Sequence, residues 1–373
     1  MGHVQSAALP QRYPHLDWLR VFAMLGVFVF HSGRAFDSDG WHLKQPVGSA
    51  YFDLQTGLLS QWLMPMFFVI SGWVTYTVLT RASAGGFTRS RLMRLGLPFV
   101  LGTLILVPPQ VYIERVTQSG VTQNFLDWFP RYFDGLYAFG GNFAWMGLHL
   151  WYLEMLLLFS ILLLPVFLWL RGPMRTLKSP DWTLPVLAGL ALLVMELLVN
   201  QYPETWGIQD FGGWSPLTYL VWFMIGHEAG RSAQFQQGLI DMRWIAAAAS
   251  LAGILVGIAI IAGAVPSPGY AVEFLLRIAV AWGGVAAMLG FAARHLTQPN
   301  AAISFANRYV LQFYVLHQTV IVMLGFWLLG WEANPFVKFL TTLAGSLAII
   351  VAGLVVYNLA KAKARALIRP AAA

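Results

Sequence analysis

Two basic side chains in the first apolar stretch have a spacing that suits chemistry at membrane depth. Arg20 and His31 both lie in the segment 16–36, eleven residues apart. Eleven residues of α-helix return to within about 20° of the starting direction, so both side chains share one face, about 16 Å apart along the axis. A basic group near one membrane surface and a titratable base near the other could follow a long ligand across the bilayer. The structural alternative is an arginine that reaches the interface and a histidine that packs.

Further ionisable residues fall in the outer halves of later apolar segments, where an uncompensated charge is costly and marks a functional candidate. His149 and Glu154 begin one such segment, and Glu196 lies near the end of the next, where it could simply reach the interface. Glu273 and Arg277 are spaced i, i+4, which allows an ion pair on one helix face. We interpret His149 and Arg277 as candidates for substrate binding and Glu154 as a candidate for catalysis. A self-neutralising structural pair is at least as good an account of Glu273 and Arg277.

Two more basic features each admit two interpretations. His317 lies near the middle of the segment 303–329. It either lines a substrate cavity or makes a helix-to-helix hydrogen bond, which is the commoner role of a lone membrane histidine. Arg89, Arg91 and Arg94 precede the third apolar segment. They either follow the positive-inside rule or clamp the phosphates of a cytoplasmic ligand.

The composition shows which solvent must surround these residues. Hydrophobic residues make up 58% of the 373 and charged residues only 10%, whereas soluble domains have about 25% charged residues. Such a surface needs lipid. The net charge of +7 would suggest nucleic acid in a soluble protein, but here the basic residues lie between apolar runs, as in cytoplasmic loops. We therefore expect a lipid bilayer and no nucleic acid as partner. The absence of cysteine excludes disulfide and thiol chemistry.

The apolar runs predict an all-α polytopic membrane protein with about ten transmembrane helices, since one crossing takes about 20 residues. The predicted spans are 16–36, 58–80, 92–113, 147–170, 184–200, 215–230, 242–264, 270–294, 303–329 and 335–360. With the N-terminus inside, the inner segments hold fifteen Lys and Arg and the outer segments five, which favours cytoplasmic N- and C-termini. We treat 1–373 as one membrane domain, with a cytoplasmic N-terminal segment 1–15 and a basic cytoplasmic tail 361–373.

Other chemistries find little support in the motifs. The chain has no Walker A motif, no glycine-rich dinucleotide fingerprint and no HExxH motif, and without cysteine we expect no metal site. The longest predicted outer loop, 114–146, carries aromatic and acidic residues. These would suit a sugar-like acceptor, although anchoring at the membrane interface explains them equally well.

Five segments together resemble membrane acyltransferase family 3. Arg20, ten intervening residues and His31 resemble the R-x10-H signature of that family. The other similar segments, in order, are Met64–Gly72, Arg89–Arg94, His149–Leu153 and Tyr314–His317. Trp41 to Pro46 and Tyr314 to Gln318 further resemble a branch that transfers succinyl groups to periplasmic glucans.

The resemblance implies transfer of an acetyl or succinyl group from cytoplasmic acyl-CoA to a hydroxyl of an extracytoplasmic glycan or lipid-linked sugar. It also implies a bacterial cytoplasmic (inner) membrane, and Arg20 and His31 as the essential pair. Acyl-CoA would be a donor substrate, with no permanently bound cofactor.

On this basis we expect Arg89, Arg91 and Arg94 to hold the phosphates of acyl-CoA. His31 would act as general base, because its ordinary pKa of about 6.5 is near working pH. Glu154 or Glu196 would orient the imidazole. Arg277 is a candidate cation that would favour succinyl over acetyl.

Two other classes compete with an acyltransferase. A multi-span transporter of a lipid-linked sugar or anion would also bury charges, but the first segment has no Gly/Pro break of the kind that transporters use. A sensor or scaffold would have no use for Arg20 and His31 on one face. Covalent acylation of an external glycan discriminates between them.

Overall fold

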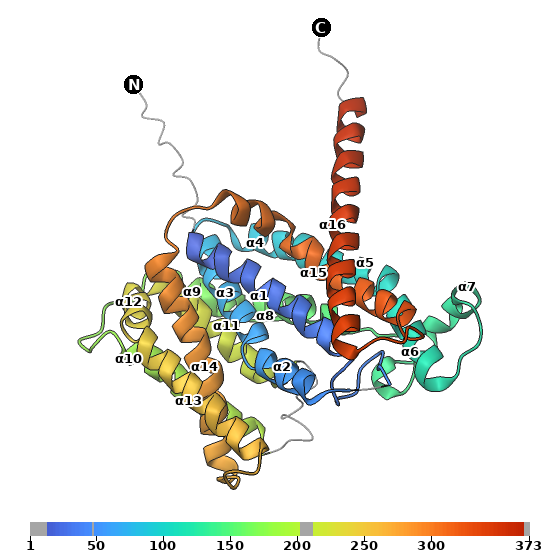
Figure 1. The fold of residues 1–373 in the computed structure, drawn as a ribbon. Helices are drawn as coiled ribbons and strands as arrows, with labels where there is room; N and C mark the ends of the chain where they lie inside the picture. Colours follow the sequence, from blue (N-terminus) through green and yellow to red (C-terminus); the bar gives the residue numbers. More distant parts are fainter. Residues whose placement is uncertain (1–12, 47, 202–211, 369–373) are drawn as a thin grey trace.

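The computed structural model describes residues 13–46, 48–201 and 212–368, which form helices, turns and loops (Figure 1). Across these ranges the only β-type pairing is one isolated bridge between Leu136 and Phe143. The predicted all-α class is therefore confirmed. The predicted N-terminal segment 1–15 and basic tail 361–373 fall largely or partly outside the described residues, but the chain remains helical to Ile368.

Each predicted apolar run contains helix, and further short helices lie between the runs. Their bounds are α1 Pro14–Gly33, α2 Ala50–Ser60, α3 Leu63–Leu79, α4 Ala84–Arg91, α5 Leu97–Ile105, α6 Pro108–Ser119, α7 Phe125–Trp128, α8 Trp151–Leu162, α9 Leu164–Trp169, α10 Thr183–Val199, α11 Pro216–Arg231, α12 Ala233–Asp241, α13 Arg243–Ile261, α14 Tyr270–His295, α15 Ala301–Trp327 and α16 Pro335–Ile368. Short 3-10 turns fill the region between α7 and α8, and the last of them, Leu148–Leu150, leads into α8.

Among the described residues, seven helical stretches are long and apolar enough to cross a membrane, so we describe the chain as an integral membrane protein. They are Pro14–Gly33, Ala50–Leu79, Ala84–Ser119, Arg243–Ile261, Tyr270–His295, Ala301–Trp327 and Pro335–Lys363. Two shorter apolar helices cover Leu148–Leu162 and Thr183–Val199. Figure 1 shows the last turns of α16 extending beyond the rest of the bundle.

Three predicted spans are interrupted, and in two of them proline explains the break. The run 92–113 begins with a π-helical turn, Leu92–Gly96, and is divided after Leu106 where α6 starts at Pro108. The run 147–170 divides between α8 and α9, next to Pro165. Proline has no N–H for the helical ladder and its ring clashes with the preceding turn. The run 58–80 divides at Gln61 and Trp62, between α2 and α3.

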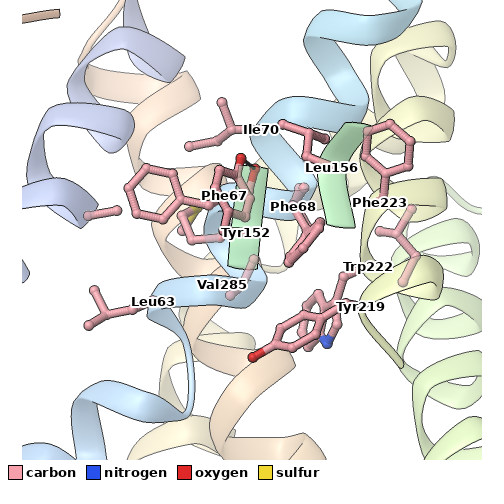
Figure 2. Close-up of a cluster of buried hydrophobic side chains, with 14 of the residues drawn as sticks. Leu63, Phe67, Phe68, Ile70, Tyr152, Leu156, Tyr219, Trp222, Phe223 and Val285 are labelled. Carbon is pink, nitrogen blue, oxygen red and sulfur yellow. Dashed lines mark hydrogen bonds between the residues drawn. The ribbon is translucent and has the colours of Figure 1, made fainter. Parts of the chain in front are cut away.

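An aromatic core joins α3, α8 and α11. Figure 2 shows Phe67, Phe68, Tyr152, Tyr219 and Phe223 gathered in this core. The ring of Phe68 is fully buried, with its centroid 5.0 Å from that of Tyr152 and 4.7 Å from that of Tyr219. These packed rings fix α8 against α3 and hold the Tyr152 hydroxyl beside the Ser71 hydroxyl, with 2.7 Å between the oxygens.

Two glycines bring α3 and α11 into backbone contact. A Cβ added at Gly72 would lie 2.0 Å from the carbonyl oxygen of Phe223, and one added at Gly226 would lie 2.0 Å from that of Val69. No larger residue fits either position at this separation. Small residues at facing positions are how membrane helices gain close van der Waals packing.

Candidate active site

Three histidines from three elements meet where α1 approaches α15. The rings of His31 and His317 have centroids 4.9 Å apart, and those of His149 and His317 are 5.3 Å apart. His31 belongs to α1, His149 to the 3-10 turn before α8, and His317 to α15. His149 and His317 are buried and His31 is partly exposed. The structure thus brings together three residues that the sequence predicted separately.

The hydrogen-bond partners determine which nitrogen of each ring carries the proton. The Nδ1 atom of His317 is 2.5 Å from the carbonyl oxygen of Tyr314, and a carbonyl can only accept, so this Nδ1 is protonated. In the neutral ring its Nε2 is then an acceptor, and it lies 3.1 Å from Nδ1 of His31. That Nδ1 also lies 3.0 Å from the carbonyl oxygen of Val27. Both neighbours accept, so His31 carries its proton on Nδ1 and has a basic lone pair on Nε2.

His149 has protein partners at both ring nitrogens. Its Nε2 lies 3.1 Å from the carbonyl oxygen of Val315, and its Nδ1 lies 3.4 Å from Nε2 of Gln110. The Tyr314 hydroxyl donates to the His149 carbonyl oxygen. The residue before it, Leu148, has a positive φ of 49°, which is a strained conformation for a leucine. In this arrangement His149 joins the 3-10 turn to α15, and its role in substrate binding stays a prediction.

Arg20 is held near the N-terminal ends of α1 and α15, at the same helix interface. Its Nη1 donates to Oδ1 of Asn307 over 3.1 Å and lies 3.5 Å from Oδ1 of Asp17. The side-chain nitrogen of Asn307 in turn donates to Asp17 over 2.6 Å. Since Asn307 and His317 both belong to α15, Arg20 and His31 face the same neighbouring helix, as their spacing on α1 predicted.

The three predicted phosphate-binding arginines do not point the same way. The Nη2 atom of Arg91 donates to Oγ1 of Thr75 on α3 over 2.6 Å, so this guanidinium lies inside the protein. Arg89 and Arg94 are exposed. The Tyr152 hydroxyl hydrogen-bonds Ser71, one helical turn from Thr75, so Tyr152 and Arg91 meet the same face of α3. Arg91 thus extends the interior polar path, whereas Arg89 and Arg94 are open to the surface.

The carboxylates do not take the predicted places. Among the residues that the structure describes, the hydrogen bonds of His31 go to Val27 and His317 and not to Glu154, whose Oε2 is buried without a hydrogen-bond partner there. The described neighbour that orients His31 is His317. Glu196 accepts from Thr218 over 2.5 Å and lies 3.4 Å from Nη1 of Arg277.

The ion pair predicted between Arg277 and Glu273 is replaced by a pair with Glu196 from α10. The Ser267 hydroxyl donates to Glu273, and the Arg277 guanidinium lies 4.0 Å from the ring centre of Trp214. The two charges of Arg277 and Glu196 neutralise each other beside an aromatic ring. Whether Arg277 selects an acyl group stays a prediction.

A polar cluster beside the histidines was not predicted. Nδ1 of His42 is 2.5 Å from Oε2 of Glu114, and the Tyr137 hydroxyl donates to the same oxygen over 2.7 Å. Trp41 connects this cluster to the site, with its ring centroid 6.4 Å from that of His31. Burial and the neighbouring Glu114 carboxylate raise the pKa of Tyr137, so the phenol remains a donor. The acidic and aromatic residues of 114–146 were the only sequence signal for this cluster. They did not indicate that His42, in the segment 41–46, would be the partner of Glu114.

Within 13–46, 48–201 and 212–368 there is no group of three or more His, Cys, Asp or Glu that could hold a metal ion. The arrangement instead offers one imidazole with an available lone pair, positioned by a second imidazole. A basic nitrogen with a fixed tautomer can accept a proton from a hydroxyl.

Comparison with known proteins identifies the class to which this site belongs. Residues 13–357 match the family described as an acyltransferase domain, and the chain belongs to that family. The resemblance seen in the five sequence segments is thereby confirmed. The chain is similar to the glucans biosynthesis protein C of Salmonella typhimurium strain LT2 and of Salmonella typhi, each 24% identical to it over 240 residues. Those alignments cover 60% of this chain and 59% of each relative. No solved structure matches the chain significantly.

Proposed function

We propose that this protein is a membrane O-acyltransferase that moves an acetyl or succinyl group from cytoplasmic acyl-CoA to a hydroxyl of an extracytoplasmic glycan or glycolipid. The observation that carries the proposal is the lone pair on His31 Nε2, since Nδ1 faces two acceptors, the Val27 carbonyl and His317 Nε2. Family membership supplies the acyl transfer, and the names of the Salmonella relatives support a glucan-like acceptor.

The topology that we propose has ten spans with both termini in the cytoplasm, in a bacterial inner membrane. Two observations support it. Each of the ten predicted spans coincides with helical structure in the described chain. The fifteen-to-five distribution of Lys and Arg has the required alternation. In this orientation Arg20 lies near the cytoplasm and His31 near the periplasm.

The chemical step is a transfer between two heteroatoms. His31 Nε2 removes the proton from the acceptor hydroxyl while its oxygen attacks the thioester carbonyl carbon. The tetrahedral intermediate then collapses with cleavage of the C–S bond. The departing thiolate takes the proton back from the His31 imidazolium, which leaves the acyl ester, free CoA and a neutral histidine. General base catalysis of this kind typically contributes about 10²–10⁴-fold.

The basic residues would serve the donor. Exposed Arg89 and Arg94 are placed to meet the phosphates of CoA at the inner surface, where guanidinium groups bind phosphate with paired donors. Arg91 and Arg20 would line the way inward, held by Thr75 and Asn307 respectively. The thin pantetheine arm would then carry the thioester toward His31.

Membranes containing wild-type protein or His31→Ala, supplied with radiolabelled acetyl-CoA or succinyl-CoA and candidate glycans, test the proposal. We expect label in the glycan fraction with the wild type and none with His31→Ala. The matched control is His295→Ala, which removes an exposed histidine at the end of α14 and should transfer normally. Near-normal transfer by His31→Ala would refute the role of the base. No label with either donor from well-folded wild type would favour a transporter.

A further inference from the structure

His42 is a second imidazole beside the site whose Nε2 has no protein partner. Its Nδ1 lies 2.5 Å from Oε2 of Glu114, whereas its Nε2 has no hydrogen bond to any residue that the structure describes. The residue is only 9% exposed. Its Nε2 is nevertheless not one of the enclosed unpaired atoms, and 11% of the side-chain surface remains accessible. His42 therefore presents an unpartnered polar atom to the outside from a largely buried position.

Three donors surround the Glu114 carboxylate that orients this ring. Its Oε2 accepts from the Tyr137 hydroxyl, and its Oε1 accepts from Nη1 of Arg115 over 3.1 Å. A carboxylate held by a guanidinium and a phenol is ionised and can only accept, so His42 carries a proton on Nδ1. In the neutral ring its Nε2 then has a lone pair, which is also the state of His31 Nε2. A carboxylate orients the imidazole of a catalytic triad in the same way.

The indole of Trp41 adjoins both of these imidazoles. Its ring centroid is 6.4 Å from that of His31 and 5.8 Å from that of His42, and the residue is partly exposed. The Trp41 carbonyl oxygen accepts from Gln118 on α6 over 2.7 Å. That bond fixes the indole against the helix that carries Glu114. An aromatic ring thus lies next to two ring nitrogens that each have an available lone pair.

These groups match the chemistry of a sugar ring. A pyranose has an apolar C–H face that can pack on an indole, and its hydroxyl groups can each donate a hydrogen bond to a lone pair. A phosphate or carboxylate ligand has no proton to give to the two nitrogens, and it would approach the Glu114 charge. The arrangement therefore favours a neutral, hydroxyl-bearing ligand over an anion.

We propose that Trp41 and His42 form a subsite for the acceptor sugar, in which His42 Nε2 accepts a hydrogen bond from one hydroxyl while a different hydroxyl of the same sugar faces His31. The subsite selects which hydroxyl is acylated. Glu114 is a positioning residue, because it acts through His42. The proposal rests on the proposed function, since it assigns the acceptor of that same site.

Two substitutions at one position provide the test. His42→Asn keeps an amide N–H near the place of Nδ1, so it retains the bond to Glu114 and loses the acceptor at Nε2. His42→Gln places an amide near Nε2, and its oxygen can accept from a hydroxyl. His295→Ala, at an exposed position, is the control. The full-length variants are reconstituted in lipid nanodiscs, with thermal unfolding as a check on folding.

The probes are methyl glucoside and its monodeoxy derivatives, each of which lacks one hydroxyl. The first measurement is binding of these sugars by ligand-observed NMR, which needs no chemical step. The second is steady-state transfer from acetyl-CoA or succinyl-CoA, which gives kcat and the KM of donor and acceptor separately. The third is the position of the acyl group in the product, also by NMR.

We expect His42→Asn to bind methyl glucoside about tenfold more weakly than the wild type, the effect of one lost hydrogen bond. The acceptor KM should rise by a similar factor, with kcat and the KM for acyl-CoA nearly unchanged. His42→Gln should recover part of the loss. One monodeoxy glucoside should bind the wild type about tenfold more weakly than the parent sugar, yet bind His42→Asn as well as the parent does, because that bond is already absent. The wild type should acylate one position and His42→Asn more than one.

Equal glucoside binding by the wild type and a well-folded His42→Asn would overturn the proposal, as would no binding by the wild type. The same losses for every monodeoxy sugar in both proteins would also overturn it, because His42 would then contact no hydroxyl. An unchanged single acyl position in His42→Asn would remove its role in selection. Binding that depends on His42 without transfer from either donor would support the subsite while refuting the proposed function.

Discussion

The imidazole of His317 lies against that of His31, with 3.1 Å between its Nε2 and the Nδ1 of His31. The N–H at His317 Nδ1 donates to the Tyr314 carbonyl, which leaves His317 Nε2 as an acceptor. In the contact between the two rings, His31 therefore donates the hydrogen bond and His317 accepts it. Asp or Glu usually occupies this orienting position in catalytic triads. Here the partner is a neutral imidazole at membrane depth, which avoids burying a further carboxylate charge.

Replacing His317 should therefore slow transfer more than it weakens substrate binding. We expect His317→Ala to lower kcat about 100-fold, the order of effect of a small misplacement of a reacting group, with little change in KM. His317→Gln should recover part of the loss, because its amide oxygen can accept from His31 Nδ1. Steady-state kinetics of both variants beside His295→Ala measure this. Equal losses in the Ala and Gln variants would mean that His317 only fills space.

Substituting the exposed arginines should have a different effect from substituting the interior one. Arg89→Ala and Arg94→Ala should each raise the KM for acyl-CoA about threefold to tenfold and leave kcat nearly unchanged, because each removes a surface contact to phosphate. Arg91→Ala should also lower thermal stability, since it leaves Thr75 without its donor inside the protein. Arg294→Ala, which removes another exposed arginine, is the control. An unchanged KM in the first two variants would make those arginines topology determinants only.

Because of Tyr137, the free energy of unfolding should fall as the pH rises into the alkaline range. Its pKa is raised in the folded state, by burial first and then by the Glu114 carboxylate that accepts its hydrogen bond. Below about pH 10 the phenol is protonated in both folded and unfolded chains, so its contribution is constant. Above that pH only the unfolded chain releases the proton, so the free energy of unfolding falls as pH rises.

Unfolding of detergent-solubilised wild type and Tyr137→Phe between pH 8 and pH 11 (about one unit either side of the free phenol pKa) measures this dependence. The wild type should lose more stability than Tyr137→Phe at the alkaline end. Tyr51→Phe, at an exposed position, should keep the wild-type slope. Identical slopes for the wild type and Tyr137→Phe would contradict the predicted coupling to Glu114.

Glycine-to-alanine substitutions should have opposite effects in two neighbouring helices. Gly72→Ala would place a Cβ 2.0 Å from the Phe223 oxygen and 2.7 Å from the His227 nitrogen, both backbone atoms that cannot rotate away. We expect a loss of about 1–3 kcal/mol or more. In α2, an added Cβ at Gly57 meets nothing within 4 Å, so Gly57→Ala should be neutral or stabilising by up to about 1 kcal/mol. Thermal unfolding of both variants checks this, and a stable, active Gly72→Ala would contradict the close packing.

Features that depend on a short stretch of chain could be predicted from the sequence. The helices follow from runs of apolar residues, and the shared face of Arg20 and His31 follows from helical periodicity. Both residues indeed contact α15, through Asn307 and His317. Pro108 could have predicted the helix break that precedes it. The apolar run continues through this proline, so the sequence instead predicted one uninterrupted span.

Contacts between distant segments could not be predicted in this way. The partner of Arg277 was expected four residues away on its own helix, yet it is Glu196 on α10. Glu154 was expected to serve His31, yet the described contacts of His31 lead to His317. Residue types and depth suggest which groups need partners, but one sequence does not say which helices lie side by side.

The π-helical turn Leu92–Gly96 has a consequence for how the helical segments before and after it are aligned. A π turn takes up one residue more than an α turn, so it shifts the angular phase of everything that follows it. Before it, Arg91 donates to Thr75; after it, the carbonyl of Thr103 accepts from the Tyr132 hydroxyl. Deleting one residue from this turn would rotate the two ends by about 100° relative to each other, and only one contact could survive. The extra residue thus sets the angular phase between the Arg91 contact and the Thr103–Tyr132 contact.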